Sequence, residues 1–391
     1  MEFGHGFLPR IDKRNWTGVD RALGPPGRLP LGDGLELPWA IADHAYAHKL
    51  PSMVRALHDH DVKVICDSSA WRYREVPTFG IEAMTAPPYA PKEPIGQVDD
   101  AFRRFVEADL RAQGEIGADA YLIPGFVPRY RDDDIGDITL AAVDIALGMT
   151  DIDARPFIAF VGMHSERLDR GVELLGRLHR AVAGAYIQVT PFRPQSDTVS
   201  KLIRCGDVYA EVAKEFVVIA GRAGGGGNFF RALGAHATDA GLAEGETFDF
   251  ASKVRPKRPG QGVEGKGFGR RVYLPSIGLS VSGKEFRLLS ATPGLQQFVR
   301  CALPCCQFKP FDTKRAVEHS LRARVTEAAE HHATPRSMAL HRLLDELAKR
   351  STALTSCNAV LNEMGEKPFK TKHLDNQAAA LARRLARSTA A

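Results

Sequence analysis

The run Val62-Lys63-Val64-Ile65-Cys66 is the first of five short apolar segments, rich in β-branched residues, that decide the fold of this 391-residue chain. Four similar runs follow it: Ala120-Tyr121-Leu122-Ile123, Phe157-Ile158-Ala159-Phe160-Val161, Ala185-Tyr186-Ile187-Gln188-Val189 and Phe216-Val217-Val218-Ile219-Ala220. Continuous apolar runs of this length are typical of parallel strands that are covered on both faces. We therefore predict a buried parallel β-sheet.

Amphipathic segments separate these runs, the clearest of them at residues 99–116, 165–182 and 199–215. Such alternation indicates right-handed βαβ units. Five or more units over about 250 residues favour a TIM-type (β/α)8 barrel within the α/β class, with an open doubly wound sheet as the alternative. From about Thr313 the chain becomes helical, most clearly at 316–331 and 336–350. We expect a barrel over residues 1–298 and a helical subdomain over 299–391.

A cysteine cluster lies at this boundary, with two adjacent histidines further along the chain. The residues are Cys301, Cys305, Cys306, His331 and His332. Thiolate sulfur and neutral imidazole nitrogen are the ligands that zinc prefers in proteins. We predict a structural Zn²⁺ site formed by Cys301, Cys305, Cys306 and His331. The sequence leaves open whether Cys305 or Cys306 is a ligand, and whether His331 or His332 is.

Composition places the chain among ordinary globular proteins, with 44% hydrophobic and 25% charged residues. The N-terminal residues do not resemble a signal peptide, and no apolar stretch approaches the roughly 18 residues of a membrane span. We expect a cytoplasmic protein with no membrane partner. The sequence does not set the oligomeric state.

Basic residues gather in a segment rich in glycine and proline, where the only acid is Glu264. Its seven cations are Lys253, Arg255, Lys257, Arg258, Lys266, Arg270 and Arg271. A second basic stretch closes the chain, with Lys367, Lys370, Lys372, Arg383, Arg384 and Arg387. Such clusters favour contact with phosphate groups, because binding releases the counterions of nucleic acid. We predict a nucleic-acid partner; the alternative is a solvated surface.

Catalytic residues of a barrel lie just beyond the carboxyl ends of its strands. Asp67-Ser68-Ser69-Ala70-Trp71 follows the first run, where an Asp can move protons and a Trp can stack on a base. Arg222 and Gly224 follow the fifth run, in a glycine-rich turn that can approach a phosphate or a flat ring. Phe248-Asp249-Phe250 precedes the basic segment. The alternatives are a helix cap for Asp67 and a surface acid for Asp249.

In this order the motifs resemble those of the tRNA-guanine transglycosylase superfamily, which also contains enzymes that insert deazapurines into DNA. The resemblance covers about residues 40–345 and implies a zinc-bearing TIM barrel. It implies that Asp67 is the acid/base and Asp249 the nucleophile or charge stabiliser. The implied contacts to base and nucleic acid are Ser68, Trp71, Gln188, Arg222, Gly224, Phe248, Phe250, Arg255, Lys257 and Arg258.

The departures from that family indicate a different base. Ser69 and Ala70 replace two glycines, and Pro124-Gly125-Phe126 stands where the purine-recognising Asp is expected. A pocket without that acid should not select guanine. We therefore expect a DNA glycosylase that flips out a modified base, plausibly in defence against phages, with DNA favoured over tRNA. The alternatives are a transglycosylase that inserts a deazapurine into DNA or tRNA, and a non-catalytic nucleic-acid-binding or accessory subunit.

Overall fold

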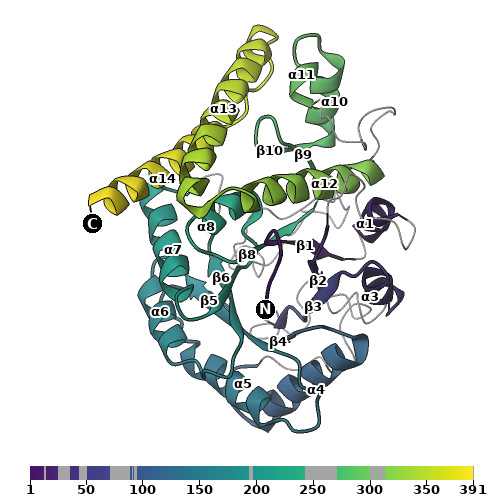
Figure 1. Ribbon diagram of the computed structural model, residues 1–391, viewed down its shortest axis with the longest axis vertical. Coiled ribbons are helices and arrows are strands. Elements are labelled where there is room, and N and C mark those ends of the chain that lie inside the picture. The colour runs from purple at the N-terminus through teal and green to yellow at the C-terminus, as the bar shows by residue number, and fades with distance from the viewer. Residues whose placement is uncertain are drawn as a thin grey trace, which may run out of the picture.

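Eight parallel strands form the centre of the protein (Figure 1). They are β1 (Phe7–Ile11), β2 (Trp39–Asp43), β3 (Lys63–Asp67), β4 (Tyr121–Ile123), β5 (Phe157–His164), β6 (Gly184–Thr190), β7 (Val217–Ala220) and β8 (Ala237–Gly241). The computed structural model describes residues 1–12, 15–24, 36–43, 51–70, 89, 91, 95–192, 197–242, 271–299, 305 and 313–390. All five sequence-predicted strands are confirmed, and β1, β2 and β8 are added to them.

The strands pair in the order β3-β2-β1-β8-β7-β6-β5-β4. A parallel bridge between Ile65 and Ala120 joins the two ends of this order. Beside it, the Asp119 carboxylate accepts a hydrogen bond from the Val64 amide at 2.7 Å, and the Asp119 amide donates to the Val64 carbonyl at 2.8 Å. The sheet is therefore a nearly closed TIM-like barrel, and the alternative of an open doubly wound sheet is wrong.

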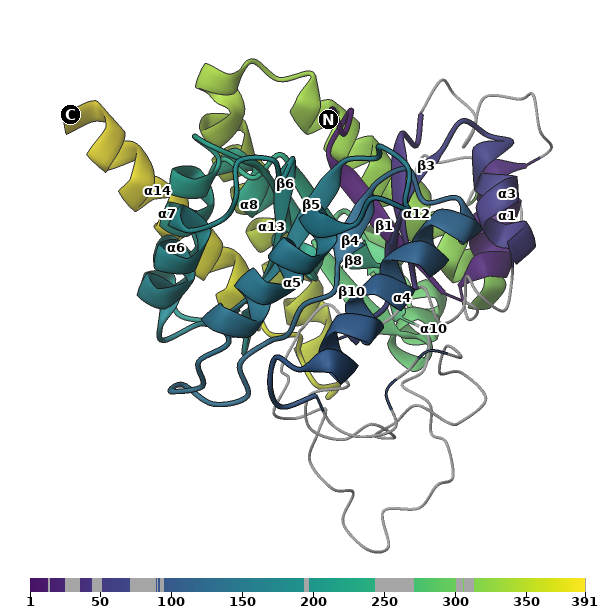
Figure 2. The ribbon, with the colours of Figure 1, turned by 90° about the horizontal axis from the view of Figure 1, so that it is seen from below.

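Helices cover the outer face of the ring and alternate with the strands. They are α1 (Trp16–Leu23), α3 (Pro51–His58), α4 (Asp100–Ile116), α5 (Gly136–Gly148), α6 (Leu168–Gly176), α7 (Val199–Val212) and the short α8 (Gly227–Ala232). Figure 2 shows α4 to α7 along one side of the barrel. The predicted helices at 99–116 and 199–215 are confirmed as α4 and α7, and the segment 165–182 contains the shorter helix α6. Asp99 and Thr198 cap two of them, since each side chain accepts a backbone amide of the first turn.

The wall of the barrel at β1 is covered by α12 (Thr313–His332), a helix from the far end of the chain. It packs against α1 and β1. Val317, Leu321 and Val325 of α12 share one apolar cluster with Phe7 and Ile11 of β1. Part of the helical C-terminal segment thus contributes directly to the barrel core.

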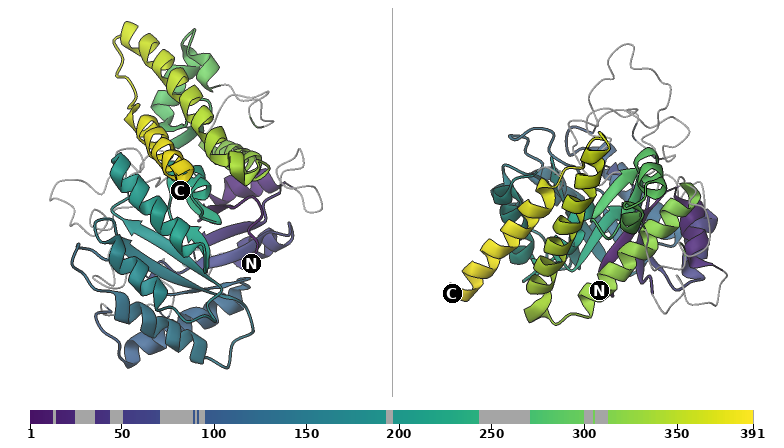
Figure 3. Two further views of the ribbon diagram at one scale, coloured as in Figure 1. Left: turned by 60° about the vertical axis from the view of Figure 1, so that its left-hand side comes forward. Right: turned by 90° about the horizontal axis from the view of Figure 1, so that it is seen from above.

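The remaining C-terminal elements lie beside α12. They are the antiparallel hairpin of β9 (Arg271–Leu274) and β10 (Leu279–Ser282), then α10 (Gly283–Ala291), α11 (Gln296–Val299), α13 (Arg336–Glu363) and α14 (Lys372–Ala390). α14 packs along α7, and α13 packs against α8 and α14. Figure 3 shows α12, α13 and α14 gathered on one side of the barrel. None of the helices in the described ranges is long and apolar enough to span a membrane.

Side chains alternate along each strand between the interior of the barrel and the helices. The interior cluster includes Leu8, Ile41, Ile65, Phe160 and Tyr186, all of them buried. Their sequence neighbours point outward into the clusters shared with the helices. The period of two is that of β-structure. The middle of the barrel is therefore packed solid, and chemistry is confined to its ends.

The N-terminal strand is held by a buried histidine whose protonation affects the stability of the fold in acid. His5 Nε2 donates to the Glu36 carbonyl at 2.7 Å, and His5 Nδ1 accepts from the Phe7 amide at 3.3 Å, so the ring is neutral. Burial lowers the pKa of His5 to about 4.

Acidification should therefore destabilise the fold through His5. Between about pH 6.5 and 4 the unfolded chain gains a proton at this residue while the folded chain does not, which reduces the free energy of unfolding by up to about 3 kcal/mol. In urea unfolding over this pH range, His5→Gln should show a shallower decline than the wild type. Parallel declines for the two proteins would contradict the assignment.

Candidate active site at the carboxyl end of the barrel

A layer of polar side chains lies on top of the apolar interior. Each polar residue follows an inward-facing residue of its strand by two positions; that residue is apolar, except for Tyr186, which precedes Gln188. Because side chains alternate along a strand, the polar side chains also point inward, nearer the carboxyl end of the barrel. The members are Arg10 of β1, Asp43 of β2, Asp67 of β3, Gln188 of β6 and Asp239 of β8, all 7% exposed or less. Asp43 and Asp67 are register partners on neighbouring strands. Catalytic groups of TIM-type barrels occupy this end.

Arg10 is the centre of this layer. Its Nη1 donates to Asp67 Oδ2 at 2.5 Å, and its Nε and Nη2 donate to Asp239 Oδ2 at 3.1 and 2.6 Å. Its Nη2 also donates to the hydroxyl of Tyr186 at 2.9 Å. Tyr186 in turn donates to Asp239 Oδ2 at 2.6 Å. One guanidinium therefore holds two carboxylates and a phenol from three other strands.

Asp67 is ionised in this setting. Burial by itself would raise the pKa of Asp67, but the guanidinium groups of Arg10 and Arg222 and the amide of Ser69 lower it below its ordinary value. The Ser69 amide donates to Asp67 Oδ1 at 2.7 Å, and Arg222 Nη2 lies 3.8 Å from Asp67 Oδ2. Asp67 can thus stabilise positive charge or accept a proton; it can donate a proton only after taking one up.

Tyr186 is a hydrogen-bond donor rather than a base. Burial and the carboxylate of Asp239 raise the pKa of Tyr186 well above its ordinary value, so the phenol keeps its proton. The ring fits because a glycine follows the neighbouring strand β7: a Cβ on Gly221 would lie 2.4 Å from a carbon of the Tyr186 ring. Gly221 therefore makes room for the tyrosine in the polar layer.

Two residues of the site adopt a backbone conformation that side chains disfavour. Ser69, just after β3, has φ 54°, and Arg222, just after β7, has φ 49°. Left-handed backbone at non-glycine residues costs on the order of 1 to 3 kcal/mol and concentrates at functional positions. In both cases it occurs where the chain leaves the barrel beside Asp67.

Several buried polar atoms of this layer have no partner among the residues that the structure describes. They are both amide atoms of Gln188, Oδ1 of Asp239 and Oγ of Ser69. Gln188 and Asp239 are fully buried. Leaving a buried polar group unpaired costs about 1 to 3 kcal/mol, and proteins rarely accept this cost without a ligand, water or functional reason. These atoms are therefore the candidate ligand contacts of the layer.

The chain that follows β4 packs against the carboxyl end of the barrel. A Cβ on Gly162 would lie 2.1 Å from the Phe126 carbonyl oxygen, and one on Gly125 would lie 2.6 Å from the Phe160 ring. The segment Pro124–Val127 therefore packs directly over β5, and Val127 joins the interior cluster. The segment in which a purine-recognising acid was expected is therefore apolar and forms a cover packed over β5.

The structure brings Asp67 and Arg222 together, and it places Gln188 on the same inward-facing layer. Ser68 is buried next to Asp67. Gly224 lies elsewhere, beside α12, where its carbonyl accepts from Arg324 Nη1 at 3.5 Å. Seven further candidates lie outside the described residues and stay predictions: Trp71, Phe248, Asp249, Phe250, Arg255, Lys257 and Arg258.

Sequence reasoning missed Arg10, Asp43, Tyr186 and Asp239. Arg10 and Asp239 lie in Phe7-Leu8-Pro9-Arg10-Ile11 and Ala237-Thr238-Asp239-Ala240-Gly241, which lack a continuous apolar run. The available signal was a single charged residue near the end of a short apolar or small-residue segment. That signal becomes informative only when the segment is known to be a barrel strand.

The structure describes two of the predicted zinc ligands: Cys305 lies beside His319 in the first half of α12, and His331 lies at the end of that helix. Cys305 Sγ is 3.6 Å from Nδ1 of His319, whose Nε2 donates to the Tyr273 carbonyl at 2.7 Å. His331 lies twelve residues further along the helix, about 18 Å away at 1.5 Å per residue. The structure therefore does not bring Cys305 and His331 together. Cys301 and Cys306 lie outside the described residues, and among those described no group of three metal-binding side chains occurs.

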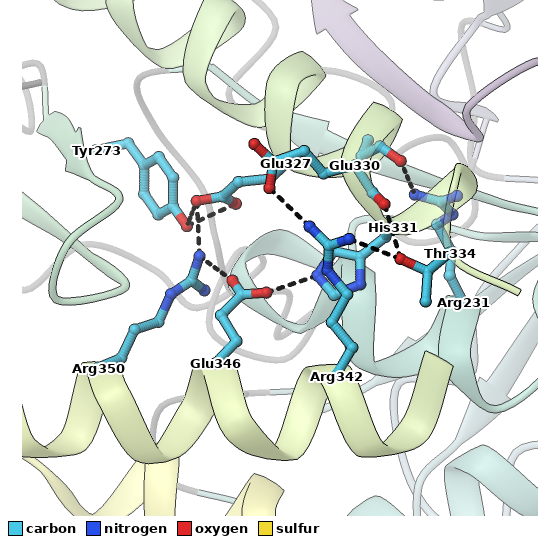
Figure 4. Close-up of polar contacts among 10 residues, drawn as sticks. Arg231, Tyr273, Glu327, Glu330, His331, Thr334, Arg342, Glu346 and Arg350 are labelled. Carbon is cyan, nitrogen blue, oxygen red and sulfur yellow. Dashed lines mark hydrogen bonds and ion pairs between the residues drawn. The ribbon is translucent and has the colours of Figure 1, made fainter. Parts of the chain in front are cut away.

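His331 belongs instead to a polar network between α12, α13 and β9 (Figure 4). Its Nε2 lies 2.7 Å from Glu346 Oε2. Arg350 pairs with both Glu346 and Glu327, and the hydroxyl of Tyr273 donates to Glu327 at 2.9 Å. Burial raises the pKa of Glu327 despite the nearby guanidinium of Arg350. This network joins the two long helices and leaves His331 with a carboxylate as its neighbour.

Comparisons with known proteins give no family. No family model matches the sequence, and no curated protein matches it. Among solved structures, the 3-dehydroquinate dehydratase from Aquifex aeolicus VF5 is similar with a TM-score of 0.33 and 9% sequence identity, over 63% of this chain and 95% of that one. A TM-score this low carries no argument about fold or function.

Removing Arg10 should strongly destabilise the barrel. In Arg10→Met the buried carboxylates of Asp67 and Asp239 lose their common cation, at a cost of about 3 to 5 kcal/mol. The matched control is Arg111→Met, which removes an exposed pair with Asp151 and should cost about 1 kcal/mol or less. Urea unfolding at pH 7 measures both. Equal midpoints for the two variants would show that Arg10 is not the organising residue.

Proposed function

We propose that the protein is a DNA glycosylase that cleaves the N-glycosidic bond of a modified nucleobase at the carboxyl end of its barrel. The observation that carries the proposal is the Gln188 amide, fully buried and without a partner for either atom in the described part of the chain. It lies in the same inward-facing layer as the ionised carboxylate of Asp67. An amide offers one donor and one acceptor, as the edge of a nucleobase requires.

The chemistry follows from the charge that develops when the base departs. Breaking the bond between a base and the sugar C1′ gives the sugar oxocarbenium character, which a nearby carboxylate stabilises. Asp67 is ionised and held in place by Arg10 and Ser69, so it can serve this role without reorganising. Water then attacks C1′, and the base leaves with a proton. To reach a buried site, the nucleotide must first leave the stack.

The choice of DNA and of a modified base rests on supporting features. The basic segment 253–271 supplies seven cations for phosphate contact. The apolar cover of Pro124–Val127 replaces a purine-recognising acid, which argues against guanine. Defence against phages with modified DNA is a setting in which such an activity would be useful.

Zinc would be held by Cys305 and His319 rather than by His331. The Tyr273 carbonyl accepts from His319 Nε2, which leaves Nδ1 with its lone pair toward Cys305 Sγ. A histidine ligand oriented by a backbone carbonyl is the usual arrangement in metal sites. Zinc bound there would stabilise the fold, with Cys301 and Cys306 as the remaining candidate ligands.

The test of the activity uses three substrates: DNA from ordinary cells, DNA from phages with hypermodified bases, and bulk tRNA. Released base and abasic sites are measured after incubation with the wild type, Asp67→Asn and the surface control Asp207→Asn, which alters an aspartate paired with Arg384 and Arg387. We expect release from the modified DNA, unchanged in Asp207→Asn and reduced at least about 100-fold in Asp67→Asn.

Other outcomes select the alternatives. Incorporation of a labelled free base without abasic sites would identify base exchange. Binding of DNA with neither release nor incorporation would indicate a non-catalytic nucleic-acid-binding or accessory protein. Equal turnover in Asp67→Asn and the wild type would remove Asp67 from the mechanism.

The metal test compares two histidines of the same helix. Purified wild type and His331→Gln should contain about one zinc per chain by elemental analysis, whereas His319→Gln should contain little, because one of the ligands is lost. Thermal unfolding with and without a chelator provides a second readout. Loss of zinc in His331→Gln, with His319→Gln unaffected, would reverse the assignment.

A further inference from the structure

We propose that Asp239 is a second substrate-contacting carboxylate, that its Oδ1 faces the reacting sugar, and that Arg10 and Tyr186 position it. The inference rests on the proposed glycosidic chemistry and deepens it. Asp239 lies in the middle of the last barrel strand, β8 (Ala237–Gly241), opposite Asp67 across the guanidinium of Arg10. It is fully buried.

The two oxygens of Asp239 have very different surroundings. Oδ2 accepts from Arg10 at 3.1 and 2.6 Å, from the Tyr186 hydroxyl at 2.6 Å and from the Arg222 amide at 3.4 Å. Oδ1 is buried and has no hydrogen-bond partner in the part of the chain that the structure describes. All of the hydrogen bonds that hold the carboxylate in place are therefore made by Oδ2, and Oδ1 is left to contact a ligand.

A purely structural aspartate in this protein looks different. Asp109 is also fully buried, yet both of its oxygens are bonded: Oδ1 accepts from Tyr89 at 2.7 Å and Oδ2 from Gln113 at 2.8 Å. A buried carboxylate oxygen without a donor is costly, so its retention indicates a role that a ligand fulfils.

The chemistry that suits Asp239 Oδ1 is a hydrogen-bond donor or a developing positive charge. The guanidinium groups of Arg10 and Arg222 face the two carboxylates of Asp67 and Asp239, so these four residues carry no excess of positive charge. A sugar with oxocarbenium character supplies that positive charge when the base departs. Asp239 would contact that sugar through Oδ1, while Tyr186 and Arg10 fix the direction of the carboxylate. No covalent step is required of it.

The first measurement is independent of turnover. The probe is a pyrrolidine analogue of 2-deoxyribose, a cationic mimic of the 2-deoxyribosyl oxocarbenium ion, titrated calorimetrically into the wild type, Asp239→Asn and Asp207→Asn. We expect binding by the wild type and Asp207→Asn, and affinity at least tenfold weaker in Asp239→Asn. Circular dichroism checks that Asp239→Asn is folded. Equal affinity in Asp239→Asn and the wild type would overturn the inference.

The second measurement uses Tyr186→Phe, which keeps every charge of the site. In base release from modified DNA, loss of the tyrosine hydroxyl removes one of the donors that fix the direction of the Asp239 carboxylate, so kcat should fall while KM changes little. Asp239→Asn should lower kcat at least about 100-fold. A merely structural role for Tyr186 would lower stability and leave kcat of the folded protein unchanged.

The outcomes separate this inference from the proposed function. If the pyrrolidine analogue binds through Asp239 but the wild type releases no base, the glycosylase proposal fails and the assignment of Asp239 stands. If base is released equally by the wild type and Asp239→Asn, the assignment fails and the glycosylase proposal stands. Absence of both binding and release overturns both.

Discussion

The guanidinium of Arg10 is the interaction on which the carboxyl end of this barrel depends. Closing eight parallel strands into a ring forces every second side chain inward, and the apolar interior leaves no water for charged groups above it. Asp67 and Asp239 nevertheless stand there on two different strands, and Arg10 binds both. Because Arg10 lies on β1 while Asp67 and Asp239 lie on β3 and β8, the ion pairs form only where these strands come together in the ring. The site and the closure of the barrel are therefore coupled.

A second coupling runs through the C-terminal helices. The barrel wall at β1 is completed by α12, which follows the last barrel strand by about seventy residues of sequence. The network of Tyr273, Glu327, Glu346 and Arg350 then ties α12 to α13 and to the β9–β10 hairpin (Figure 4). Buried ion pairs of this kind add little net stability. They fix one arrangement of the helices, because removing one partner leaves the other charge buried and unpaired. The C-terminal helices are thus joined to the barrel wall through α12 rather than attached separately.

The sequence predicted the central strands well because their signal is strong. The runs at 62–66, 120–123, 157–161, 185–189 and 216–220 are apolar on both faces, as the interior and the surrounding helices require, and each became a strand. The strands β1 and β8 were missed because Arg10 and Asp239 interrupt the apolar pattern with side chains that build the site. The strand β2, which ends at Asp43, was missed as well. Asp67, Arg222 and Gln188 were identified because each lies in or just after a strand that the pattern had already located.

The sequence by itself determined which segments are buried strands and helices, because burial on two faces demands apolar residues at a fixed period. It also placed an aspartate at the end of one strand and a glutamine on another. Only the tertiary structure decided which charged groups meet, because Arg10, Asp67, Tyr186 and Asp239 are separated by up to 229 positions and come together solely through closure of the ring. The same holds for His319 beside Cys305 and His331 beside Glu346: one helix carries both histidines, and packing assigns their partners.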